Sequence, residues 1–332
     1  MNLHGVSLDS EQRRVFGEAP LIGSHSLHQL ELFSDDELAA LLDRHPREHV
    51  YALTMGSDPM RWDENRLALH DGLSGHQLLD AVKRGRLWLN IKRVDEHEPE
   101  YARIVRELYG QLAAQVPGFE VEQVKTTLLI SSPRALVYYH VDGAPSLLWH
   151  LRGEKRVWMY PALDERFISR ELLEDIHAGV AHEYVPYEPH FDNHAQVKVL
   201  EPGQFASWPQ NAPHRVTNLD SFNVSLNTEH YTAASRRRAR VYSANRFLRT
   251  HLHLPDLATK DHGLRAFAKS VLHRAASMAG LDKRQTKRHV PTMRVDPTAP
   301  LCVRPLLETK PPVEKRQRKR ASAVATATRR SS

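Results

Sequence analysis

Residues 137–161 read VYYHVDGAPSLLWHLRGEKRVWMYP, and this stretch carries the strongest signal of the fold. Short apolar and aromatic runs alternate here with turn-forming residues, at Gly143-Ala144-Pro145 and again at Gly153. Similar runs, rich in Val, Leu, Tyr, Trp and Thr, extend from Phe119 to about Tyr231. About seven short strands separated by turns predict a β-sandwich or jelly roll.

Helical patterns flank this β-rich region on both sides. Capping signals and amphipathic runs predict a mainly helical region over residues 1–118, which we expect to pack on the core. Residues 233–282 contain two further amphipathic patterns, and residues 283–332 are basic and predicted to be disordered. The predicted class is therefore α+β, with a mainly β core over residues 119–232.

The composition of the 332 residues limits the kind of protein. A hydrophobic content of 41% with 26% charged residues is typical of a soluble globular protein, and no run approaches the roughly 20 apolar residues of a membrane span. The N-terminus lacks a secretion signal, so we expect a cytoplasmic protein. The single cysteine, Cys302, excludes an internal disulfide and a thiolate cage, so a metal would need His and carboxylate ligands.

The formal net charge of +6 arises from the end of the chain. Residues 310–332 hold eight Lys or Arg and one Glu, a balance of +7, which leaves −1 for residues 1–309. The tail could contact nucleic acid through weak, salt-sensitive attraction, but it carries no aromatic residues for base stacking. A nucleic-acid function is therefore not expected.

A candidate metal site lies in the opening stretch. His140 and Asp142 are two residues apart on an expected strand, so both side chains should point to the same face. His214 comes 74 residues later, at the end of EPGQFASWPQNAPH (residues 201–214) and before another expected strand. Two histidines and one carboxylate are the ligand set of non-haem Fe(II) oxygenases.

The H-x-D pattern alone is weak evidence. With 21 His and 40 acidic residues, about 2.5 H-x-[DE] matches are expected by chance, and the chain has a second one at His190-Phe191-Asp192. Prolines and Asn193 around that second match predict a loop, and no lysine-bearing strand follows it. His140 has the strand context, which favours it over His190.

The two segments HVDGAPSLLWHLRGEKRVWMYP and EPGQFASWPQNAPHRV together resemble JmjC-type, cupin-fold 2-oxoglutarate oxygenases, particularly the group of the asparaginyl hydroxylase of hypoxia-inducible factor. In that family the H-x-D pair precedes a strand, a Gly turn and a basic strand, and a later Pro-Gly segment supplies the last histidine. The resemblance covers about residues 121–231. It implies a double-stranded β-helix with a catalytic Fe(II) held by His140, Asp142 and His214.

The resemblance also implies a site for 2-oxoglutarate. Lys155 falls where the family has the lysine that pairs with the far carboxylate of the cosubstrate. Such a pairing is chemically reasonable, because a buried carboxylate without a cation would cost several kcal/mol. Asn227 matches a family asparagine beside the cosubstrate.

One cosubstrate contact departs from the family pattern. The family has a threonine three residues before the first ligand histidine, whereas this chain has Val137. Tyr138 lies two residues before His140 and should share its face, so it is the expected replacement donor; Thr127 on the preceding strand is another.

The predicted activity is hydroxylation by dioxygen and 2-oxoglutarate of a protein side chain or a small molecule, and the residues do not separate these two substrates. The alternative is a metal-binding cupin that acts as a sensor or scaffold without oxygenase activity. The resemblance also leaves a homodimer through the C-terminal helices open. A histidine-rich insertion could hold a second metal or form a polar lid; its histidines are His177, His182, His190 and His194.

Overall fold

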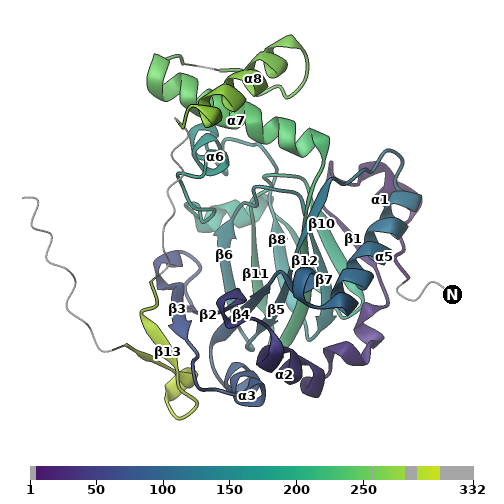
Figure 1. The fold of residues 1–332 in the computed structure, drawn as a ribbon, viewed down its shortest axis with the longest axis vertical. Helices are drawn as coiled ribbons and strands as arrows, with labels where there is room; N and C mark the ends of the chain where they lie inside the picture. The colour runs from purple at the N-terminus through teal and green to yellow at the C-terminus, as the bar shows by residue number, and fades with distance from the viewer. Residues whose placement is uncertain (1–4, 256, 281–289, 307–332) are drawn as a thin grey trace, which may run out of the picture.

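The computed structural model describes residues 5–255, 257–280 and 290–306. Within these ranges a ten-stranded and a four-stranded sheet form the centre of the molecule, and helices lie against the larger sheet and at one end (Figure 1). The mixed α+β class that the sequence predicts is therefore confirmed.

The larger sheet has the order β1-β10-β7-β12-β5-β4-β2-β3-β13-β14. Its strands are β1 (Leu21–Ser24), β2 (Val50–Thr54), β3 (Arg66–Leu69), β4 (Leu87–Lys92), β5 (Gln123–Ser131), β7 (Ser146–Arg152), β10 (Gln204–Trp208), β12 (Asn223–Tyr231), β13 (Met293–Val295) and β14 (Val303–Pro305). Neighbours are antiparallel except β3 and β13, which are parallel. Strand β5 joins the two parts of the sheet, because β12 pairs with it on one side and β4 on the other.

The smaller sheet is antiparallel and has the order β6-β11-β8-β9. Its strands are β6 (Leu136–His140), β8 (Lys155–Met159), β9 (Gln196–Leu200) and β11 (His214–Asn218). Between β5 and β12 the chain passes back and forth between the two sheets, and side chains of both pack into one apolar cluster that includes Leu148, Val157 and Trp208. The two sheets are therefore layers of one sandwich.

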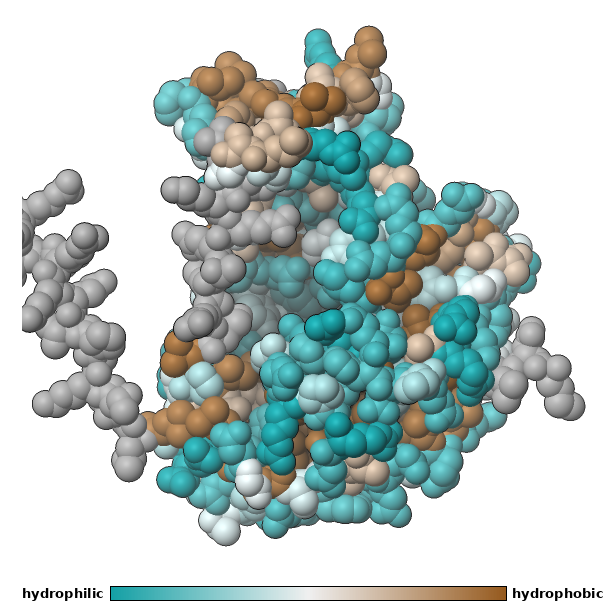
Figure 2. Space-filling model, in the orientation of Figure 1, coloured by the Kyte–Doolittle hydropathy of each residue, from teal (hydrophilic) through white to brown (hydrophobic). Residues whose placement is uncertain are grey.

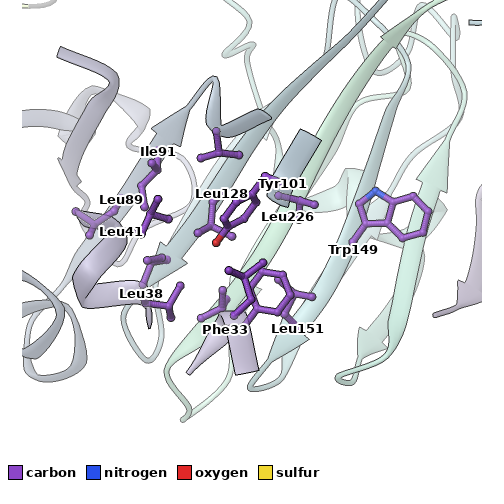
Figure 3. Packing of buried hydrophobic residues seen from close by; sticks show 14 of the residues in the cluster. Phe33, Leu38, Leu41, Leu89, Ile91, Tyr101, Leu128, Trp149, Leu151 and Leu226 are labelled. Carbon is purple, nitrogen blue, oxygen red and sulfur yellow. The ribbon is translucent and has the colours of Figure 1, made fainter. Parts of the chain in front are cut away.

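Helices from the first 118 residues cover the other face of the larger sheet. They are α1 (Ser10–Val15), α2 (Asp35–Arg44), α3 (Gly75–Arg84), α4 (Val94–His97) and α5 (Pro99–Gln115). Leu38 and Leu41 of α2 and Tyr101 of α5 pack with Leu128 and Leu226 of the sheet (Figure 3). Short 3₁₀ turns lie at Leu27–Gln29, Glu31–Phe33, Arg47–His49, Trp62–Glu64, Pro189–His194 and Pro300–Cys302.

Three segments form strands that the sequence does not predict. The first 118 residues supply β1 to β4 in addition to the helices, and His214–Asn218 forms β11. Residues 290–306 belong to the predicted disordered tail, and for this part the prediction is wrong. Here β13 adds to the edge of the sheet beside β3, and the side chains of Val295 and Cys302 are buried. This burial and strand pairing offset the conformational entropy that a polar segment loses when it becomes ordered. The rest of the tail lies outside the described residues.

Three helices form the end of the molecule above the smaller sheet: α6 (Arg170–His177), α7 (Ala233–Leu252) and α8 (Leu264–Met278). Arg249 of α7 forms an ion pair with Glu174 of α6, and this pair stabilises the contact between the two helices. Apolar residues gather on the surface at this end (Figure 2), and Leu264 and Phe267 of α8 are 89% and 70% exposed. Among the described residues, no helix combines the length and the hydropathy that crossing a bilayer requires.

Candidate metal centre

His140, Asp142 and His214 come together at one end of the sandwich. Each offers a ligand atom, and the three atoms lie within 4.8 Å of one another. His140 ends β6, His214 begins β11, and the two residues face each other in the antiparallel ladder. Asp142 differs from the expectation, because it lies on the loop after β6 rather than on the strand.

Both histidines are oriented by backbone carbonyl groups. Nδ1 of His140 lies 2.7 Å from the carbonyl oxygen of Tyr138, and Nδ1 of His214 lies 3.1 Å from that of Ala212. A carbonyl can only accept, so each Nδ1 carries the proton and each Nε2 presents a lone pair. The Nε2 atoms of His140 and His214 lie 3.7 and 3.6 Å from the carboxylate oxygens of Asp142.

Burial keeps the second histidine in the form that binds metal. The side chain of His214 is almost fully buried, with the Trp208 ring 4.2 Å from its own ring centre. Burial, reinforced by the neighbouring His140, lowers the pKa of His214 to about 4. A neutral imidazole whose other nitrogen donates to a carbonyl is the usual arrangement of a metal-ligating histidine.

A cavity of about 240 Å³ opens beside these three residues. It lies between the two sheets, because its walls include Leu148 of β7 and Val216 of β11. The predicted cosubstrate residues that line it are Lys155, Asn227 and Thr127. Asn227 and Thr127 are directly opposite each other on β12 and β5.

Lys155 is the buried cation of this cavity. It begins β8 and is only 4% exposed, and within the part of the chain that the structure describes its ammonium forms no ion pair or hydrogen bond. Burial lowers the pKa of its ammonium to about 7. An unpaired buried ammonium is costly, so the cavity is suited to an anion.

The expectation for Tyr138 is wrong, because β6 contains a β-bulge. In the pairing with β11, His140 lies opposite His214, but Val137 rather than Tyr138 lies opposite Val216. The extra residue reverses the alternation of side chains between Val137 and His140. Val137 therefore lines the cavity, whereas the Tyr138 hydroxyl accepts a hydrogen bond from the Gly56 amide outside it.

The second H-x-D match is structural. His190 is exposed and lies 3.2 Å from Glu188. Asp192 accepts hydrogen bonds from the hydroxyls of Tyr160 and Tyr187, and it pairs with the buried guanidinium of Arg215. Through these hydrogen bonds and this ion pair, Asp192 connects the insertion to β11 at the residue that follows His214.

The four histidines of the insertion do not converge. His177 contacts Asn211, His182 packs on Trp62, and His194 packs on Phe167. Over residues 5–255, 257–280 and 290–306, the group of His140, Asp142 and His214 is the one that meets the geometry of a metal site. A second metal in this insertion is therefore not supported.

Several residues of the cavity were not predicted from the sequence. Glu183 and Tyr184 reach it from the insertion, and Trp88 and Asn90 reach it from β4. Burial, together with the nearby Asp142, raises the pKa of Glu183 to about 7. No local sequence signal marks these positions, because they enter the cavity through pairings between distant segments.

No protein-family model and no curated protein matches the sequence. Among solved structures, a crystal structure of Escherichia coli YcfD is similar, with a TM-score of 0.48 and 16% identity over 85% of this chain and 70% of that chain. Another YcfD structure, described as a ribosomal oxygenase in complex with cobalt and 2-oxoglutarate, has a TM-score of 0.47 and 14% identity over 87% and 74% of the two chains.

Proposed function

We propose that this protein is an Fe(II)- and 2-oxoglutarate-dependent oxygenase that hydroxylates a C–H bond. One observation carries the proposal: a single cavity has the His140, Asp142 and His214 group in its wall and the unpaired ammonium of Lys155 as well. The first feature fits a divalent metal, and the second fits an anion. A metal-binding protein without a cosubstrate would gain nothing from the buried lysine.

The ligand set fits Fe(II). His140 and His214 would donate through Nε2, and Asp142 would donate through its carboxylate. Two neutral imidazoles and one carboxylate suit Fe(II) and leave positions for other ligands. Bound Fe(II) supplies the redox chemistry by which dioxygen and 2-oxoglutarate yield succinate, carbon dioxide and a hydroxylated product.

The rest of the cavity fits the cosubstrate. We propose that Lys155 receives the far carboxylate of 2-oxoglutarate, with Asn227 and Thr127 as further polar contacts. Binding of a carboxylate raises the proton affinity of Lys155 again, so the ammonium form is stabilised in the complex. Val137 and Leu148 give the cavity apolar walls, which restrict access of water.

The order of strands supports a double-stranded β-helix core. Strands β5, β12, β7 and β10 are neighbours in the larger sheet, and β6, β11, β8 and β9 form the smaller one. Each sheet receives strands from both halves of residues 123–231, as two intertwined β-helices would require. The proposed metal ligands lie where β6 and β11 begin or end at one opening of this core.

Several finer predictions from the sequence stay predictions. These are the relation to the asparaginyl hydroxylase group, the cytoplasmic location, the choice between a protein and a small-molecule substrate, and a homodimer. Sedimentation of the purified protein tests the homodimer. Screening of peptides and free metabolites for hydroxylation tests the substrate class.

Anaerobic titration with Fe(II), with and without 2-oxoglutarate, tests the function. The visible charge-transfer band of a keto acid chelated to Fe(II) should appear in the wild type and weaken in Lys155→Met. Lys198→Met is the matched control, because Lys198 is an exposed lysine on the neighbouring strand β9. Iron binding without the charge-transfer band would refute the oxygenase proposal and favour the alternative, a metal-binding cupin that acts as a sensor or scaffold.

A further inference from the structure

Asp142 lies outside the β-sheet ladders, although its carboxylate must be held near two histidines. It belongs to residues 141–145, which connect β6 to β7, so it lacks the strand pairing that fixes His140 and His214. We propose that Gln210 and Asn211 are positioning residues, which hold this loop so that Asp142 meets the metal. The inference rests on the proposed function, because it assigns Asp142 as a ligand.

Two consecutive side-chain amides hold two consecutive carbonyl groups of the loop. Nδ2 of Asn211 donates to the carbonyl oxygen of Asp142 at 3.1 Å, and Nε2 of Gln210 donates to that of Gly143 at 3.0 Å. Both side chains belong to residues that are at most 4% exposed. Polar groups of buried side chains are costly to leave without a partner, so these two bonds fix the main chain that directly follows the Asp142 Cα atom.

The same segment carries the last metal ligand. Asn211 lies three residues before His214, in a turn closed by the bond from the Ala212 amide to the Pro209 carbonyl at 3.0 Å. Its φ of 66° lies in the left-handed region, which asparagine tolerates better than most residues. The turn therefore sets the position of Asp142 directly relative to His214.

The hydrogen bonds continue into the C-terminal helices. The Asp142 carbonyl can only accept, so Asn211 turns its NH₂ group to it and its Oδ1 to His177 of α6, whose Nε2 lies 3.1 Å away. Nε2 of Gln210 also lies 3.3 Å from the carbonyl oxygen of Ser235 in the first turn of α7. The position of Asp142 is thus coupled to helices that contribute no ligand.

The test is the affinity of the metal-free protein for Co(II), a redox-stable substitute for Fe(II), measured by calorimetry. Asn211→Gly keeps the left-handed backbone and deletes the amide, and Gln210→Leu is the second variant. Each should raise the Kd about 10- to 100-fold, the usual effect of losing a group that orients a ligand. Asn245→Ala is the matched control: it deletes a buried amide that donates to the Ala258 carbonyl and touches no residue of the loop.

Amide hydrogen exchange of residues 141–144 in the metal-free proteins gives a second readout. Exchange should be faster in Asn211→Gly and Gln210→Leu, and unchanged in Asn245→Ala. The inference is overturned if both site variants keep the wild-type exchange, or if the control weakens Co(II) binding as much as they do. If the wild type itself binds no Co(II), the proposed function fails, and the exchange of the loop still decides whether the two amides hold it.

Discussion

Replacing Lys155 by methionine should stabilise the metal-free protein while it removes the anion site. Burial lowers the pKa of this lysine from 10.5 to about 7, and each unit of difference between folded and unfolded pKa is worth 1.36 kcal/mol. The difference of about 3.5 then corresponds to about 5 kcal/mol of lost stability below pH 7. Methionine has a similar length and no charge, so it should recover most of this free energy.

The sign of the pH dependence follows from proton counting. Between pH 7 and 10.5 the unfolded chain holds a proton on Lys155 that the folded protein lacks, so the stability of the wild type rises with pH in this window. The advantage of Lys155→Met should therefore fall from about 5 kcal/mol at pH 6 to about 2 kcal/mol at pH 9. Urea unfolding of the two metal-free proteins at both pH values measures it.

The same variant should lose the stabilisation that the cosubstrate provides. With metal present, 2-oxoglutarate at about 100 times its Kd should stabilise the wild type by about 2.7 kcal/mol and leave Lys155→Met nearly unchanged. Lys198→Met, on the exposed side of β9, should behave as the wild type does. The reasoning about Lys155 is refuted if its methionine variant is no more stable than the wild type at pH 6, or if the difference between them does not depend on pH.

Three further predictions concern the same region. The Kd of the metal-loaded protein for 2-oxoglutarate should be constant below about pH 7 and rise by up to about tenfold per pH unit above it. The reason is that Lys155 must hold its proton to bind the carboxylate, and calorimetry across pH 6 to 9 measures the change. Val137→Thr adds a hydroxyl inside the cavity and should tighten 2-oxoglutarate binding about fivefold in the same assay, whereas Tyr138→Phe should not change it. Asp192→Asn leaves the buried Arg215 without its anion and should cost about 2 kcal/mol in urea unfolding, with little effect on Co(II) affinity.

Local patterns were sufficient to find most strands of the core. Between β5 and β12, apolar runs and turn residues alternate closely enough to predict the strand that contains His140 and the strand that begins at Lys155, whereas the short β11, which begins at His214, was not expected. The strands β1 to β4 escaped prediction because they are only four to six residues long and pair with partners far away in the sequence. Strand formation at such positions depends on the neighbouring strands more than on the residues themselves.

The positions of Tyr138 and Asp142 needed the structure for a different reason. Both predictions assumed regular alternation of side chains along one strand. A bulge in β6 removes Tyr138 from the cavity, and the end of β6 at His140 leaves Asp142 on a loop. Both departures depend on how β6 pairs with β11, which the spacing of residues in β6 alone does not encode.

The bulge also explains why the residue three positions before His140, rather than the residue two positions before it, faces the cavity. In a regular strand, a residue three positions before the histidine would point away from the metal, but the bulge turns Val137 toward the cavity. The threonine that the resembling family has at this position would therefore face a cosubstrate, and valine leaves that contact unmade. Lys155 has no such substitute: among the described residues it is the buried cation of the cavity without an anionic partner. With this buried ammonium and no hydroxyl at position 137, the proposed 2-oxoglutarate site would take most of its affinity from the ion pair, so Lys155→Met should weaken 2-oxoglutarate binding far more than Asn227→Ala or Thr127→Ala.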